Sequence, residues 1–361
     1  MPPQGLIADS VYASTKSYAG KGALLSRATI ENLTEARDLE ELILRLKATA
    51  YDEAVSRVEK PISASRIELA AREHVAKVHF DLIRISPSAP LLSASFLRYI
   101  TLNLKTVLKG KALGKSFDDL RRHVDLYPEE LIGRRDLINR ALVTEGLDEA
   151  AAELGKNEFT QDVHMAISAY KNNKRLEVFD LYLDKAYYTN LSAVFSTLGG
   201  GKYSFGGGVT KVSDLISLDV DSHNILSVLR AKSWNISFNE TKSLLIEPTY
   251  GISLQRLMKM ASAEDVASAA RYLESSLYRK ILPSGGTDEV VLIGALEHSF
   301  KILSYEIASH PFVWDVFSDV LPFALTRLKE LEMLTISAIA FGVEQNIEPR
   351  EIQPKIIMPK K

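Results

Sequence analysis

The sequence predicts an all-α protein, and three observations lead to this fold class. Apolar residues recur at helical spacing along most of the 361 residues. Residues that favour helix starts, chiefly serine and aspartate, stand directly before several of these amphipathic stretches. Alternation with a period of two residues between hairpin turns, which is typical of half-buried strands, is not evident.

Three stripes of apolar residues predict long helices, two in the first hundred residues and one near the C-terminus. The stripes consist of Leu39, Leu42, Ile43 and Leu46; of Ile67, Ala71, Val75, Val78 and Leu82; and of Val316, Val320, Phe323, Leu328 and Leu331. Pro322 falls inside the third stripe. Because proline lacks the amide hydrogen that a helix interior needs, we expect it to end or kink a helix there.

Helix starts are marked by three serines, each directly before an amphipathic stretch: Ser26, Ser116 and Ser237. Ser237 is followed three residues later by Glu240, an arrangement in which each side chain can cap the other's backbone amide. Such caps contribute about 1 kcal/mol each. Because they set where helices begin, they also give reference points for comparing segments.

Comparison from these reference points reveals an internal repeat. A lysine lies five residues before each serine, at the end of a helical segment, in the pairs Lys21–Ser26, Lys111–Ser116 and Lys232–Ser237. The segments before the second and third pairs are similar, and each begins with an asparagine, Asn103 or Asn224. Chance likeness among capped amphipathic helices is the alternative explanation.

The repeat continues beyond the caps. Tyr51 and Phe159 stand 108 residues apart, a shift shared by the stretches that precede them, and Tyr278 ends a similar stretch further along. A partial copy that begins at Thr335 closes the chain. We therefore predict three similar helical units, which span residues 1–98, 99–219 and 220–361.

One segment departs from the helical pattern. Six of the nineteen glycines lie within Gly199–Gly208, a density that no packed helix tolerates. The segment lacks the spacing of a phosphate-binding loop and follows a helical stretch instead of a strand. We therefore interpret it as a loop of the second unit between helices and expect no nucleotide there.

Composition excludes several classes of function. The 44 lysine and arginine residues nearly balance the 46 aspartate and glutamate residues, and a formal net charge of −2 argues against a nucleic-acid binder. With no cysteine, the chain has no disulfide or cysteine nucleophile. The apolar stretch Met333–Val343 is shorter than the ~20 residues that span a membrane. No basic segment followed by an apolar run opens the chain, so we expect a cytoplasmic protein.

Residues with catalytic or metal-binding chemistry form no recognisable site. His74 and His79 are five residues apart, which places them about 140° from each other around a helix, unsuitable for one metal. Asp118 and Asp119 lack the third carboxylate of an aspartate-rich metal clamp, and we interpret them as first-turn acids that complement the helix dipole. We predict no catalytic residue, no cofactor, no metal and no small-molecule substrate.

Basic residues gather at the ends of two predicted helices. Lys111 and Lys232 occupy matching places in the repeat, and Arg230 lies two residues before Lys232. Cations are favourable at helix C-termini in any case, and this structural explanation stays open. Because equivalent positions of a repeat can face one opening, we also predict that Lys111, Arg230 and Lys232 contribute to partner binding.

Several segments, taken together and in order, resemble a known family. They are Tyr12–Lys16, Leu24–Ser26, Glu35–Leu42, Leu46–Tyr51, Val220–Ile225, Leu229–Lys232, Ile246–Pro248 with Gly251, Ala338–Gly342 and Ile347–Ile352. The chain resembles the C subunit of archaeal A-type and V-type rotary ATPases, whose counterpart in the eukaryotic vacuolar enzyme is the d subunit. It departs from that family's usual residues at Thr335, Phe341 and Val343, and the loop Gly199–Gly208 resembles an insertion.

The resemblance implies a fold and a mechanical role. The fold would be a funnel of three similar helical units around a pseudo-threefold axis, with a central cavity. One copy per complex would join the central shaft subunits to the membrane proteolipid ring, peripheral to the cytoplasmic face of the membrane. The chain would couple shaft rotation to proton or sodium transport linked to ATP synthesis or hydrolysis, without catalysing a reaction itself.

Two other functions stay open on the sequence. Helical repeats also form scaffolds that bind other proteins, and such a scaffold would not associate stably with a ring or shaft. An all-α enzyme that uses Asp118, Asp119 or the Gly199–Gly208 loop is the third hypothesis. A metal or nucleotide that bound such an enzyme would stabilise it against heat.

Overall fold

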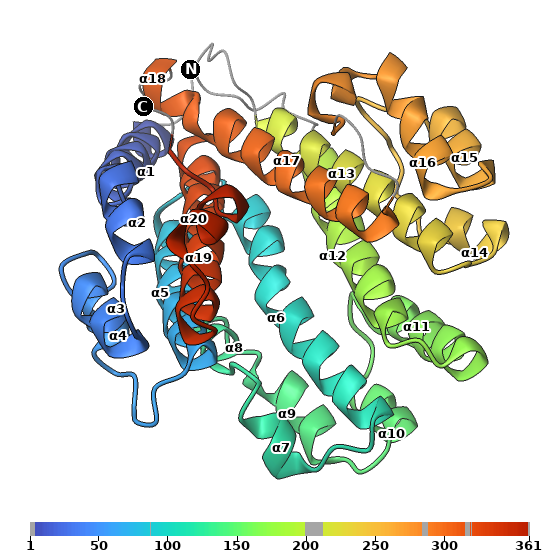
Figure 1. Ribbon diagram of the computed structural model, residues 1–361, viewed down its shortest axis with the longest axis horizontal. Helices are drawn as coiled ribbons and strands as arrows, with labels where there is room; N and C mark the ends of the chain where they lie inside the picture. The colour runs from blue at the N-terminus through green and yellow to red at the C-terminus, as the bar shows by residue number, and fades with distance from the viewer. Residues whose placement is uncertain are drawn as a thin grey trace. The chain divides into compact units, whose positions relative to one another are not determined.

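The computed structural model describes residues 4–86, 88–198, 212–283, 288–314, 318 and 320–359, which form helices joined by turns and short connections (Figure 1). No strand occurs among them, which confirms the predicted all-α class. The Gly199–Gly208 segment lies outside the described residues. Among the helices within these ranges, none combines the length and the hydrophobicity of a membrane span.

Long helices are separated along the chain by short helices and turns. In chain order they are α1 (Gln4–Gly22), α2 (Arg27–Thr34), α3 (Leu39–Leu46), α4 (Asp52–Val55), α5 (Ala64–Ile85), α6 (Ala89–Ala112), α7 (Phe117–Arg121), α8 (Tyr127–Leu131), α9 (Arg135–Val143), α10 (Leu147–Glu153), α11 (Thr160–Asn173), α12 (Glu177–Thr197), α13 (Val212–Ser233), α14 (Phe238–Ser243), α15 (Leu254–Ser262), α16 (Val266–Arg271), α17 (Glu289–Ser309), α18 (Pro311–Trp314), α19 (Val320–Glu344) and α20 (Pro349–Ile352). Short 3-10 helices are η1 (Tyr272–Ser275), η2 (Leu277–Ile281) and η3 (Gln353–Lys355).

The chain forms two compact units. The first contains Met1–Leu92 and Lys301–Lys361, so the C-terminal helix α19 packs with the N-terminal helices α1 and α5. The second contains Ser93–Lys202 and Ser213–Phe300. The division into three helical units at 1–98, 99–219 and 220–361 stays a prediction.

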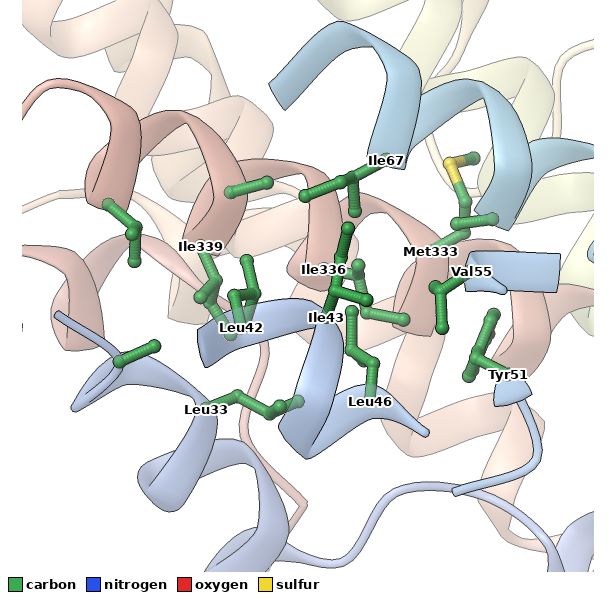
Figure 2. Packing of buried hydrophobic residues seen from close by; sticks show 14 of the residues in the cluster. Leu33, Leu42, Ile43, Leu46, Tyr51, Val55, Ile67, Met333, Ile336 and Ile339 are labelled. Atoms are coloured by element: carbon green, nitrogen blue, oxygen red, sulfur yellow. The ribbon is translucent and has the colours of Figure 1, made fainter. Parts of the chain in front are cut away.

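The core of the first unit is built where α19 lies along α5 and receives α2 and α3 (Figure 2). Leu42 and Leu46 of α3 point into the same cluster as Ile336 and Ile339 of α19, and all four are almost completely buried. The apolar stripe of α3 was predicted from its spacing, and burial of that stripe is what fastens the short helix to the two long ones.

The serines predicted to begin helices do so. Ser26 accepts a hydrogen bond from the Thr29 amide at 3.1 Å, and Ser116 accepts one from the Asp119 amide at 3.2 Å. At α14 the capping box forms in both directions, because Glu240 also accepts a hydrogen bond from the Ser237 amide at 3.3 Å. These bonds satisfy amides that a helix start otherwise leaves without a partner.

Pro322 begins a helix, so our expectation that it would end or kink one is wrong. It is the third residue of α19, which runs without interruption to Glu344. Amides in the first turn have no partner within the helix, so a proline there removes no hydrogen bond. Val316, the first residue of the predicted stripe, lies outside the described residues.

Helix α3 offers a matched pair of substitutions that tests the core. Leu46 is fully buried, whereas Leu44 on the same helix is 69% exposed. We expect Leu46→Ala to destabilise the first unit by about 2–5 kcal/mol, because it leaves a cavity between α3 and α19. Leu44→Ala should change stability by less than about 0.5 kcal/mol. Denaturant unfolding followed by circular dichroism measures both, and equal effects would contradict this core assignment.

Candidate partner-contact site

The residues predicted to contact a partner stand at helix ends that share one geometry. Helices α6, α13 and α19 are each followed by a residue in the left-handed conformation: Gly114 (φ 68°), Asn235 (φ 54°) and Asn346 (φ 54°). The amide of the next residue returns to a carbonyl five positions earlier, at 2.8–2.9 Å, in the pairs Lys115–Gly110, Ile236–Ala231 and Ile347–Gly342. This is the Schellman helix stop, and glycine and asparagine tolerate the positive φ that it needs. The helix ends at Lys111 and Lys232, which the sequence repeat aligns, therefore share this geometry with the end of α19, in the partial copy.

The turn at Lys21 differs from these three. The Leu24 amide bonds to the Lys21 carbonyl at 3.2 Å, but no residue of the fully described turn 21–26 has a positive φ. The Leu25 amide instead donates to the Glu332 carboxylate. The three equivalent turns thus hold Lys111, Lys232 and Val343, and Lys21 belongs to a variant of them.

A buried asparagine links each of two of these helices, α6 and α13, to the backbone that follows it at a constant spacing. Asn224 donates to the Ile246 carbonyl at 3.0 Å and accepts from the Ile246 amide at 2.8 Å. Asn103 makes the same pair of bonds with Asp125. Both partners lie 22 residues further along the chain. The amide side chain thereby satisfies a buried N–H and a buried C=O at once, which a packed interior requires.

Thr335 occupies the corresponding position on α19. Its hydroxyl, which has one proton, lies 3.0 Å from the Leu331 carbonyl of its own helix and 3.5 Å from the Ile357 carbonyl, again 22 residues further along. A hydroxyl is too short to bridge both backbone groups as an asparagine does. Thr335 therefore does not reproduce the pair of bonds that Asn103 and Asn224 make.

Two of the three helices carry a buried carboxylate three residues before this position. Asp221 accepts a hydrogen bond from the Tyr278 hydroxyl at 2.7 Å, and Glu332 accepts one from the Tyr51 hydroxyl at 2.8 Å. Burial raises the pKa of Asp221, against the lowering effect of its hydrogen bonds from Tyr278 and from nearby backbone amides. The two tyrosines align in the sequence repeat, whereas the carboxylates were not predicted, although their fixed spacing from the asparagine position could have revealed them.

In the remaining copy both partners are apolar. Ile100 stands three residues before Asn103, Phe159 stands at the tyrosine position, and both Ile100 and Phe159 are completely buried. A hydroxyl without a carboxylate, or a carboxylate without a hydroxyl, would leave a buried polar group unpaired. Apolar residues at both positions leave no buried polar group unpaired and so avoid that cost.

Lys111 is a buried cation. Only 6% of its surface is exposed, and its ammonium donates to the carbonyls of Leu142, at 2.8 Å, and of Thr144 at the end of α9. Burial lowers its pKa, and the nearby charges of Glu145 and Glu149 oppose that shift. Lys111 therefore ties the end of α6 to the end of α9.

Arg230 and Lys232 lie near the end of α13, apart from the contacts of Lys111. Arg230 forms an ion pair with Glu297 of α17 at 2.6 Å, in which both side chains are partly exposed. Lys232 is partly exposed, and among the described residues its side chain has no ion pair or hydrogen bond. Their role in partner binding stays a prediction.

The other residues that the sequence singled out have structural surroundings. Asp119 accepts from the Ser116 hydroxyl at 2.8 Å at the start of α7, as a first-turn acid. The ring of His74 packs against that of Tyr51, tilted by 45° with centroids 4.5 Å apart, and the ring of buried His79 bonds to the Leu92 carbonyl at 3.0 Å. The described part of the chain holds no group of three or more acidic or histidine side chains suited to a metal.

Glu129 of α8 is a buried carboxyl that no sequence pattern singled out. It is completely buried and accepts a hydrogen bond from the Asn103 side-chain amide at 2.8 Å. Burial raises its pKa to about 8; the Asn103 bond and the charge of Arg134 lower it, whereas the Asp125 carboxylate raises it. Glu129 is therefore largely protonated at neutral pH.

The Tyr278–Asp221 bond can be tested by removing one oxygen. We expect Tyr278→Phe to lower the free energy of unfolding by about 1–3 kcal/mol, because the buried Asp221 carboxylate loses a donor. Tyr272→Phe, at an exposed ring six residues earlier, is the matched control and should be nearly neutral. Urea unfolding measures both. A neutral Tyr278→Phe would show that the carboxylate does not depend on the hydroxyl.

Glu129 makes stability fall as pH rises from about 4.5 to about 8. Its folded pKa of about 8 lies above its ordinary value of 4.5, so its contribution is complete below pH 4.5 and is lost as pH rises to about 8. Between about pH 6.5 and 8.5 we therefore expect the wild type to lose more stability than Glu129→Gln. His74 and His223, whose pKa values burial lowers from 6.5 to about 4, affect stability chiefly between those two values and do so equally in all three proteins. Parallel urea midpoints for Glu129→Gln and the exposed control Glu130→Gln test this, and identical slopes for all three proteins would contradict it.

Nearly the whole chain matches one protein family. The family model of the ATP synthase (C/AC39) subunit matches residues 13–355. The A-type ATP synthase C subunit of Methanocaldococcus jannaschii is 23% identical over 97% of this chain and 87% of its own length. The corresponding C subunits of Thermococcus kodakarensis and Pyrococcus horikoshii are each 24% identical, over 95% and 96% of this chain and 88% and 89% of their own lengths. The chain therefore belongs to the ATP synthase (C/AC39) subunit family, as a non-catalytic subunit.

Proposed function

We propose that this chain is the adaptor of a rotary A-type ATP synthase that connects the central shaft subunits to the membrane proteolipid ring. The family match over residues 13–355 carries the proposal. In this role one copy of the chain lies at the cytoplasmic face of the membrane and transmits torque. Ion transport and ATP synthesis or hydrolysis then stay coupled through it.

The repeated helix ends support a mechanical role. Three long helices stop in the same way, and two of them are each fastened to a segment 22 residues further along by a buried asparagine, in the pairs Asn103–Asp125 and Asn224–Ile246. An element that transmits torque has to resist bending at its joints, and buried, satisfied hydrogen bonds restrict such motion. As part of the proposal, three such copies surround a pseudo-threefold axis and form a funnel with a central cavity that receives the shaft.

The basic residues take different parts in this proposal. Lys232, partly exposed at the end of α13, would meet an acidic side chain of the partner, and Arg230 would do so in exchange with Glu297. Lys111 would act indirectly, because its ammonium already bonds to the carbonyls of Leu142 and Thr144. It would hold the ends of α6 and α9 together in the conformation that the partner binds.

Binding of the purified chain to the purified shaft subunits tests the proposal, with size-exclusion chromatography and light scattering as the measurement. We expect one copy of the chain in a stable complex. Lys232→Glu should lower the affinity of the chain for the shaft subunits and make that affinity depend less on salt. Lys242→Glu, which changes an exposed charge on α14, should do neither. If the chain binds neither the shaft nor the shaft with added ring, the adaptor role is wrong and a general helical scaffold becomes the better interpretation.

A further inference from the structure

Leu277 is a large apolar residue with 80% of its surface exposed. It begins η2, and two aromatic residues near it, Tyr250 and Tyr272, are also exposed. A single exposed leucine is ordinary on a protein surface. Leu277 differs from such a residue in three respects. Hydrogen bonds fix the backbone beside it, exposed cations lie near it in the sequence, and the matching positions of the other copies hold other residue types.

A buried polar cluster fixes the backbone on both sides of the exposed residues. Asp221 accepts hydrogen bonds from the Tyr278 hydroxyl and from the amides of Tyr250, at 3.1 Å, and of Gly251. A Cβ added at Gly251 would lie 2.9 Å from the Tyr278 hydroxyl and 3.2 Å from Leu277 Cδ1. The segments that carry Tyr250 and Leu277 are therefore in contact, and their shape exists before any partner binds.

Exposed cationic residues lie near Leu277 in the sequence. The segment 271–280 contains three cations, Arg271, Arg279 and Lys280, and one acid, Glu274, for a net charge of +2. All four are exposed, and among the described residues none of the three cations forms an ion pair. Arg256 of α15 adds a guanidinium that donates to the Ser275 carbonyl. We call Arg271, Arg279 and Lys280 the basic rim of Leu277.

The other copies of the repeat show that the fold does not require these residues. Aligning Tyr278 with Tyr51 and Phe159 places Ala50 and Glu158 at the position of Leu277. The matching segments 44–53 and 152–161 have net charges of 0 and −1. Glu158 forms an ion pair with Arg134 of its own chain, so its carboxylate gives no evidence for a partner protein at that position. Of the three copies, the third alone combines a large exposed apolar residue at this position with a net positive charge.

We propose that segment 271–280, together with Tyr250, is a docking surface for an acidic amphipathic helix of a central shaft subunit. Leu277 enters the apolar face of that helix, and Arg271, Arg279 and Lys280 meet the carboxylates beside it. The inference rests on the proposed adaptor function, and it assigns the contact to one of the three copies. A preformed surface loses little conformational entropy on binding, and its charges speed association with an acidic partner.

Two variants of the full chain test the docking surface against purified shaft subunits. Leu277→Ala removes the apolar anchor, with Leu44→Ala, at the 69% exposed leucine of α3, as the control. The double variant Arg279→Glu/Lys280→Glu reverses the charge of two residues of the basic rim. Its control is Lys47→Glu/Lys156→Glu, which changes two exposed lysines of the matching segments. Biolayer interferometry at several salt concentrations gives Kd, and thermal unfolding checks that each variant is folded.

We expect Leu277→Ala and the double reversal each to raise Kd by about tenfold or more, and the double reversal to flatten the salt dependence. Both controls should stay within about twofold of wild type. If the wild type binds the shaft and neither variant weakens it beyond its control, the docking surface is wrong while the adaptor function stands. If the wild type fails to bind even with the ring added, both proposals fail.

A parallel experiment with vesicles that contain anionic phosphatidylglycerol separates a protein partner from a lipid surface. The docking proposal expects no difference in vesicle binding between wild type and Leu277→Ala. If Leu277→Ala and the double reversal abolish vesicle binding and leave the shaft complex unchanged, the surface serves the membrane, and the assignment to a shaft helix is overturned.

Discussion

Hydrogen bonds between a long helix and the backbone 22 residues further along hold two copies of the repeat together. Asn224 satisfies both the amide and the carbonyl of Ile246, and Asn103 does the same for Asp125. Backbone groups in a buried turn outside regular helix need such partners, because an unpaired one costs as much as a lost hydrogen bond. The asparagine makes it possible for a non-helical segment to return into the core and to close the copy.

Around this contact, the copies differ in ways that preserve hydrogen bonding. The carboxylate–tyrosine pair appears as Asp221 with Tyr278 and as Glu332 with Tyr51, and in the remaining copy both positions are apolar. Glu332 has further partners, because the Lys329 ammonium lies 2.7 Å away and a backbone amide of the turn after α1 also donates to it. A buried charge is tolerated only with such compensation. The first compact unit therefore has a charged centre between α19 and the N-terminal helices, inside an otherwise apolar core.

Burial also changes what a basic residue can do. Lys111 and Lys232 occupy equivalent places, yet Lys111 bonds to two carbonyls of its own chain while Lys232 reaches the surface. The difference comes from α9, which in the second copy ends close to the turn after α6. Equivalence in a repeat thus predicts backbone geometry much better than it predicts the function of a side chain. The same holds for Leu277, whose counterparts are Ala50 and Glu158.

Features that arise within a few residues of each other follow from the sequence alone. The all-α class, the serine caps and the register of the repeat depend on helical periodicity and on side chains that bond to nearby amides. The effect of Pro322 was misjudged because it depends on where α19 begins, which packing sets. The meeting of Glu332 with Tyr51, and the burial that shifts the pKa values of Lys111 and Glu129, emerge only in the tertiary fold. Burial depends on side chains from several helices at once, and no local pattern of residues encodes it.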